Sequence, residues 1–187
     1  MNILIIPEDF RSDQYILKPI FERLFRSIGR RRARVEVCLE PLLGGVDEAL
    51  KSDRISEIVM FYPMTDIFIL CVDRDGREGR RDRLDELEEE FGSDNQFLAE
   101  NAWEEIETWV LAGLDLPAEW RWRDVRAEIH VKELYFEPLA ARRGMSDSPG
   151  GGRKSLAEEA ARRIDAIRQK CPEDFDHLAR RLAAVSS

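Results

Sequence analysis

The 187-residue chain lacks any apolar run long enough to span a bilayer, which excludes an integral membrane protein of the helical kind. Its first residues, 1–6, are strand-like and are too short and uncharged for a secretory signal. Cysteine is scarce, and Cys38, Cys71 and Cys171 form no Cys-x-x-Cys pair, so neither a zinc site nor a disulfide framework is expected. We therefore expect a cytoplasmic protein that does not contact a membrane.

Several familiar site motifs are also missing. The glycine-rich segment 150–155 lacks the G-x-x-x-x-G-K-[ST] spacing of a phosphate-binding loop. The segment 73–76, Asp-Arg-Asp-Gly, is not a calcium-binding EF-hand, because its glycine comes too early and the closing glutamate is misplaced. A phosphatase of the haloacid dehalogenase type would carry its aspartate pair after the first strand, where this chain has Glu8. Of the two histidines, His130 is expected to be structural.

The net charge of −9 disfavours indiscriminate binding to nucleic acid. The positive charge is nevertheless clustered and consists mainly of arginine, whose planar fork suits phosphate. Solvated helix faces are the alternative explanation for most of these side chains. The clusters contain Arg23, Arg26, Arg30, Arg31, Arg32 and Arg34, then Arg74, Arg77, Arg80, Arg81 and Arg83, then Arg142, Arg143, Arg153 and Lys154.

The segment 66–76 organises the chain. A continuous apolar run ends in Asp73 and Asp75, which is typical of a central parallel strand buried on both faces. Strand alternation would direct these two carboxylates to one side and Arg74 to the other. Two carboxylates so close suit a divalent cation such as Mg²⁺ or Mn²⁺. The alternative is a charged turn after a strand, with Asp-Gly as turn residues.

The remaining pattern predicts an α/β fold in one domain over residues 1–187. We expect a Rossmann-like parallel sheet of about four strands flanked by helices in residues 1–115 and a mainly helical extension in residues 116–187. Residues 125–131 fit either an edge strand or a helix. The expected strands are 2–6, 34–39, 67–72 and 96–99, and the expected helices are 15–28 with Asp13 as a possible cap, 46–61, 80–91, 101–111, 131–141, 155–170 and 172–185.

Glu8 follows the first strand as Asp73 follows the third. If these strands are neighbours, Glu8, Asp73 and Asp75 meet at the carboxyl edge of the sheet, where ligands of α/β proteins collect. One or two divalent ions held there could activate water and stabilise the leaving oxygen in phosphodiester cleavage.

This arrangement resembles the Toprim domain, which occurs in topoisomerases, bacterial-type primases and nucleases of the overcoming-lysogenisation-defect type. The segment 101–112, Asn-Ala-Trp-Glu-Glu-Ile-Glu-Thr-Trp-Val-Leu-Ala, is similar to a helix of small stand-alone Toprim-like proteins of bacteria, some of which work with ATPases in defence against phage. The chain has no separate domain for a strand-transferring tyrosine and no zinc module, so topoisomerase and primase activities are not expected.

The resemblance implies a set of site residues. Glu8 would act as metal ligand or general base, Asp73 and Asp75 would hold Mg²⁺ or Mn²⁺, and Lys154 would face the scissile phosphate. Glu107 and Glu104 would add carboxylates; a helix over 101–111 would align them with Glu100 on one face, for which a solvated acidic face is the alternative. Arg74, Arg77 and Arg153 are the arginines predicted to contact nucleic acid.

Two hypotheses of different class follow. The first is a metal-dependent nuclease acting on DNA or RNA. The second is a non-catalytic or partner-dependent subunit that docks on an ATPase or another protein, which the heavily charged helices and the absence of a DNA-binding module favour. The sequence leaves the oligomeric state open.

Overall fold

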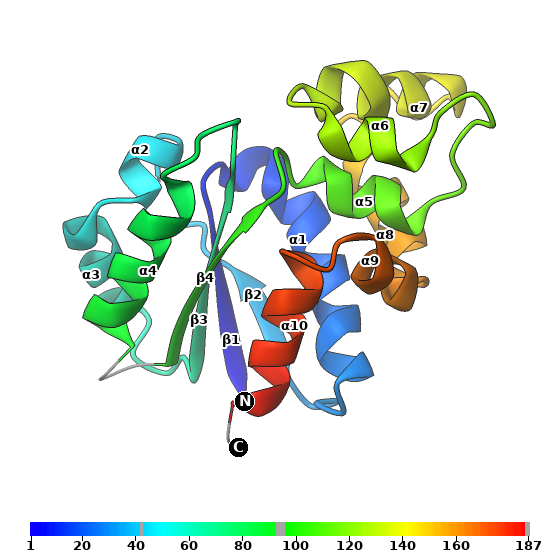
Figure 1. The fold of residues 1–187 in the computed structure, drawn as a ribbon. Coiled ribbons are helices and arrows are strands. Elements are labelled where there is room, and N and C mark those ends of the chain that lie inside the picture. Colours follow the sequence, from blue (N-terminus) through cyan, green and yellow to red (C-terminus); the bar gives the residue numbers. More distant parts are fainter. Residues whose placement is uncertain (42, 93–95, 186–187) are drawn as a thin grey trace.

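The computed structural model describes residues 1–41, 43–92 and 96–185. A parallel four-stranded sheet with the order β2-β1-β3-β4 lies at its centre, between layers of helices (Figure 1). The predicted α/β fold is therefore confirmed. The strands are β1 (Asn2–Pro7), β2 (Arg34–Val37), β3 (Ile67–Asp73) and β4 (Gln96–Ala102).

Strands β1 and β3 are direct neighbours at the middle of the sheet. Their register pairs Ile6 with Leu70 and Pro7 with Cys71, so both strands end at the same edge. Every residue of β3 before Asp73 is buried, as predicted for a strand covered on both faces.

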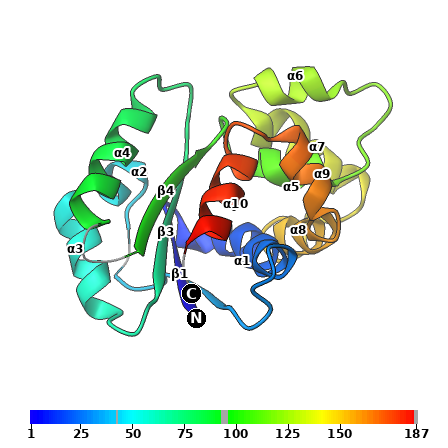
Figure 2. The same ribbon diagram turned by 60° about the horizontal axis from the view of Figure 1, so that its bottom comes forward.

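Helices cover both faces of the sheet. Figure 2 shows α2 (Val46–Ala49), α3 (Ser52–Phe61) and α4 (Arg80–Phe91) on one side, and α1 (Phe10–Ser27) and α10 (Phe175–Ala184) on the other. Because successive side chains of a strand point to opposite faces, the sheet separates two apolar cores. One core contains Leu4 and Ile6, and the other contains Ile3 and Ile5.

The C-terminal part of the described chain is helical, as predicted, and its helices α8 (Arg153–Ala161) and α9 (Ile164–Lys170) pack against α1. Ring centroids of Phe21 in α1, Trp109 and Phe175 lie 5.2–6.4 Å apart, so these helices share one core with the sheet. None of the helices in the described ranges is long and apolar enough to cross a membrane. The remaining elements are α5 (Glu107–Gly113), α6 (Trp122–Ala127), the π-helix η1 (Lys132–Phe136) and α7 (Glu137–Arg142).

Several predicted boundaries are wrong. Helix α1 begins at Phe10, and its cap is Asp9, whose carboxylate accepts from the N–H of Arg11 over 3.0 Å; the cap is not Asp13. The helix predicted over 46–61 is divided into α2 and α3, and the one predicted over 155–170 is divided into α8 and α9. Of residues 125–131, for which an edge strand and a helix were both open, 125–127 lie in α6 and none lies in a strand.

The helix predicted over 101–111 is also wrong. Strand β4 continues to Ala102, and α5 begins only at Glu107. Distant side chains stabilise this arrangement, because the buried Glu100 carboxylate contacts Arg81 and His177 at 3.0 and 2.8 Å. Glu100, Glu104 and Glu107 therefore lie in a strand, a loop and a helix, and they share no helix face.

Candidate active site at the carboxyl edge of the sheet

Glu8 and Asp73 meet at the carboxyl edge of the sheet. Glu8 follows β1, Asp73 ends β3, and the backbone N–H of Asp73 donates to Oε2 of Glu8 over 3.1 Å. The adjacency predicted from the sequence is thus present. The Asp73 carboxylate in turn accepts from the backbone N–H of Ile106 over 2.8 Å, which connects β3 to the start of α5.

Asp75 belongs to the turn that follows β3. Its φ of 53° is left-handed, so strand alternation does not extend to this residue. The prediction that alternation directs Asp73 and Asp75 to one side of the strand is therefore wrong. The turn is fixed by the backbone carbonyl of Glu104, which accepts from the N–H groups of Arg74 and Asp75 over 2.8 and 3.2 Å. The Asp75 side chain is 44% exposed and contacts Arg80 at 3.5 Å.

Two further carboxylates approach Glu8 and Asp73 from helices. Asp13 lies in the first turn of α1 and accepts from the N–H of Asp9 over 3.1 Å, and Glu107 opens α5. We refer to Glu8, Asp13, Asp73 and Glu107 as the acidic edge. Sequence reasoning treated Asp13 only as a possible cap; the available signal was an acidic residue in the first turn of the helix directly after β1.

The acidic edge carries more negative charge than its surroundings compensate. Burial raises the pKa of Glu8 to about 7, opposed by the hydrogen bond from Asp73 and assisted by the charge of Asp75. Burial, followed by the charges of Glu107, Glu8 and Asp9, raises the pKa of Asp13 to about 8.

The pKa of Asp73 is shifted in the same direction as the pKa values of Glu8 and Asp13. Burial raises the pKa of Asp73 well above its ordinary value, and the charges of Glu8, Glu107 and Asp13 act in the same direction. At neutral pH such a cluster retains protons or attracts a cation.

Two predicted arginines neutralise glutamates near this edge. Arg153 contacts Glu107 through Nη2 and Nε at 2.6 and 3.0 Å, with side chains only 11% and 5% exposed. Arg74 contacts Glu104 at 2.7 Å, and its guanidinium lies 4.2 Å from the ring centroid of Trp103. The N–H of Gly76 also donates to Glu104, over 2.6 Å.

The other predicted basic residues are differently placed. Arg77 is exposed in the turn after β3. Lys154 is exposed and lines a hollow with Tyr15 and Lys18 on α1, away from the contacts that define the acidic edge. The structure thus brings Glu8, Asp73, Glu107 and Arg153 together, whereas Glu104 pairs with Arg74 and Lys154 lies apart.

The donor chemistry of the acidic edge fits a divalent metal ion, because hard carboxylate oxygens and uncompensated charge favour Mg²⁺ or Mn²⁺. Its side-chain positions do not form a ready cage. Within residues 1–41, 43–92 and 96–185, no three Asp, Glu, His or Cys side chains are grouped so that they could hold one ion. A metal site here therefore requires side chains to move on binding.

Comparisons with known proteins add no assignment. No protein-family model matches the chain, and the searches of curated proteins and of solved structures give no significant match. The function is therefore inferred from the geometry of the acidic edge.

Proposed function

We propose that the protein is a nuclease of the Toprim type that hydrolyses phosphodiester bonds with Mg²⁺ or Mn²⁺. The observation that carries the proposal is the meeting of Glu8 and Asp73 at the ends of neighbouring parallel strands, where burial leaves both carboxylates without sufficient compensating charge. Ligand sites of open α/β sheets lie beyond this edge.

The residues have separate roles in this proposal. Glu8, Asp73 and Asp13 would hold the metal ion, which when bound supplies positive charge for the phosphate and an acidified water. In the alternative role, with Asp73 and Asp13 alone on the metal ion, the Glu8 carboxyl, whose pKa burial raises to about 7, is suited to accept a proton from attacking water at neutral pH. Arg153, rather than Lys154, is the cation nearest the acidic edge, and the exposed Arg77 is available to the backbone of a nucleic acid.

The test is cleavage of single- and double-stranded DNA and RNA with Mg²⁺, with Mn²⁺ or with a chelator. We expect Glu8→Gln and Asp73→Asn to lower the rate by at least roughly a hundredfold. Asp147→Asn, a change of the same type at an exposed turn, should retain it. Metal-dependent cleavage that persists in purified Asp73→Asn protein would exclude the acidic edge as the active site.

A partner-dependent subunit is the second candidate, and the ion pairs at the edge favour it. Glu104 and Glu107 are engaged by Arg74 and Arg153, so a partner that draws these arginines away would release carboxylates. In that case the isolated chain is inactive, a complex with its partner, such as an ATPase, is active, and Asp73→Asn abolishes the activity of the complex. An isolated chain as active as any complex would contradict this candidate.

A further inference from the structure

Strand β2 is the outermost strand of the sheet and is paired on one side only. The N–H groups of Arg34 and Cys38 donate towards β1, to Met1 and Ile5, over 2.9 and 2.7 Å. Alternate residues of a parallel strand face the same neighbour, so Val35 and Val37 direct their backbone groups away from β1. No described strand lies on that side. An open edge of this kind is a template for pairing with another chain.

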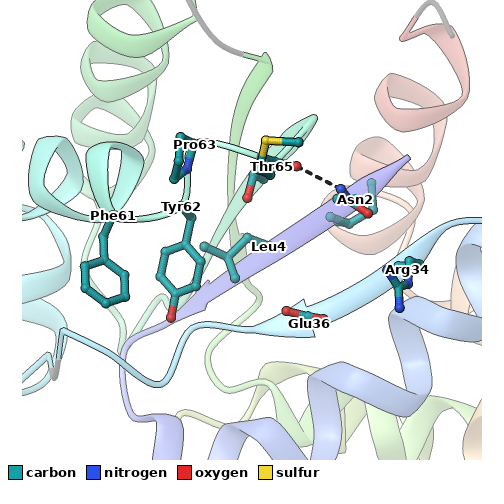
Figure 3. A pocket seen from close by; sticks show the side chains of 10 residues that line it. Asn2, Leu4, Arg34, Glu36, Phe61, Tyr62, Pro63 and Thr65 are labelled. Atoms are coloured by element: carbon teal, nitrogen blue, oxygen red, sulfur yellow. Dashed lines mark hydrogen bonds between the residues drawn. The ribbon is translucent and has the colours of Figure 1, made fainter.

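Exposed apolar side chains gather near this edge. Arg34 and Glu36 lie along β2 at one side of a hollow of about 310 Å³, and Phe61 and Tyr62 from the end of α3 lie at the other (Figure 3). Phe61 is 59% exposed and Met64, which also lines the hollow, is 79% exposed. Of the six large apolar side chains that are exposed in the described ranges, Phe61 and Met64 line this hollow, and Leu39 follows β2 two residues after its end.

The charges along β2 are arranged so that the strand complements itself when it is reversed. Arg31, Arg32 and Arg34 precede or open the strand, and Glu36 and Glu40 lie in or beyond its second half. An antiparallel copy therefore sets positive charge against negative charge along the whole edge. A parallel copy would align like charges, which is unfavourable at directly opposed positions.

The backbone allows a two-fold axis at Val35 or at Val37, and only the axis at Val35 pairs the two charged residues within β2, Arg34 and Glu36. Because Val35 faces the open side, two copies can exchange N–H···O bonds between their Val35 residues. Arg34 then lies opposite Glu36 of the partner subunit, at positions where opposed side chains approach most closely. A register centred on Glu36 would instead oppose two like carboxylates.

We propose that β2 is the interface of a homodimer in which two copies pair antiparallel about Val35 and join their sheets. A two-fold axis at Val35 forms both Arg34–Glu36 pairs at once and closes the assembly. The partner subunit also covers the exposed Phe61 and Met64. This inference does not depend on the nuclease activity, since β2 contributes no residue to the acidic edge.

Sedimentation velocity over a range of concentrations tests the proposal with the full chain. The native protein is expected at about twice the 21.7 kDa mass of one chain. Arg34→Glu and Glu36→Arg each create like-charged pairs and should raise the dissociation constant of the dimer roughly tenfold or more. The double variant Arg34→Glu/Glu36→Arg should recover the native value, and an equimolar mixture of the two single variants should form a heterodimer.

Two controls keep the test decisive. Arg162→Glu makes the same charge change at an exposed position outside β2 and should leave the dimer intact. Phe61→Ser weakens the interface independently of the charges on β2. A native chain that is monomeric at every concentration, or a dimer that neither single charge variant weakens, would overturn the proposal.

Discussion

The backbone N–H of Asp73 donates to the Glu8 carboxylate over 3.1 Å, across 65 residues of sequence. One acidic residue is thus held in place by the main chain of another. The hydrogen bond orients Glu8 but does not remove the cost of burying both carboxyls, because burial still raises the pKa of each. The cost of burying these two carboxyls should therefore be measurable in the stability of the protein.

Stability is expected to fall as pH rises through the titration of the acidic edge. Burial raises the pKa of Glu8 from 4.5 to about 7 and that of Asp13 from 3.8 to about 8. For each group, at pH values between its ordinary pKa and its raised pKa, the folded state binds more protons than the unfolded state. The free energy of unfolding therefore decreases with increasing pH in that interval. Urea unfolding from about pH 5 to about pH 8 measures the slope. Glu8→Gln and Asp13→Asn should each reduce it, whereas Asp147→Asn should not; a slope unchanged in both variants would contradict the assignment.

Replacing Asp73 by asparagine is expected to stabilise the protein while removing a proposed ligand. The amide oxygen can still accept from the N–H of Ile106, and the neutral side chain avoids the cost that raises the pKa of Asp73. We expect the free energy of unfolding at pH 7 to rise, because the folded state no longer has to bury a carboxyl that would be ionised in the unfolded chain. Asp147→Asn, at an exposed turn where the side chain forms no ion pair with any described residue, should change it by less than about 0.5 kcal/mol. Loss of stability in Asp73→Asn would show that the carboxylate is already compensated.

The ion pair between Arg153 and Glu107 is expected to be a strong structural contact. Arg153→Ala leaves a buried carboxylate unpaired among the other acidic residues and should cost about 3 kcal/mol. Lys154→Ala, at the next and exposed position, should cost less than about 0.5 kcal/mol. Chemical denaturation compares the two, and adding Glu107→Gln to Arg153→Ala should recover part of the loss. Equal effects of the two alanine variants would contradict a buried pair.

Gly113 is expected to tolerate no side chain, because α5 approaches α8 closely there. A Cβ at Gly113 would lie 2.7 Å from the carbonyl oxygen and 2.8 Å from the Cα of Ala160. Gly113→Ala should therefore destabilise the protein by about 1–3 kcal/mol. Gly44→Ala meets only the Glu48 side chain at 3.5 Å and should be neutral or slightly stabilising. Thermal unfolding of both variants tests this, and a neutral Gly113→Ala would mean that the two helices separate at little cost.

The parts of the fold that depend on local pattern could be predicted. Helix α4 has the predicted bounds because its apolar seam, with Leu84 and Leu87, follows a regular helical period. Strand β3 was predictable because an apolar run followed by carboxylates has few alternatives. Once β1 and β3 are taken as neighbouring parallel strands, the proximity of Glu8 and Asp73 follows, because both residues lie at the carboxyl ends of these strands.

The connection from β4 to α5 could not be predicted, because its polar residues are stabilised by distant side chains. The N–H of Trp103 donates to Asp174 over 2.8 Å, and Glu100 pairs with Arg81 and His177. The helical spacing of the residues in 101–111 therefore predicted a helix where the structure has the end of β4 and a loop before α5.

The basic residue at the acidic edge was likewise beyond sequence reasoning. Arg153 and Lys154 are adjacent, and only the packing of α8 decides that Arg153 reaches Glu107.

The contact among Phe21, Trp109 and Phe175 bears on the order of folding during synthesis. A nascent chain that leaves the ribosome exposes Phe21 well before Trp109 and Phe175 have been made. The face of the sheet beneath α10 stays uncovered for that interval, and contacts so distant in sequence form slowly. The Asp73 carboxylate cannot accept its hydrogen bond from the N–H of Ile106 until Ile106 has been made, which happens in the second half of translation.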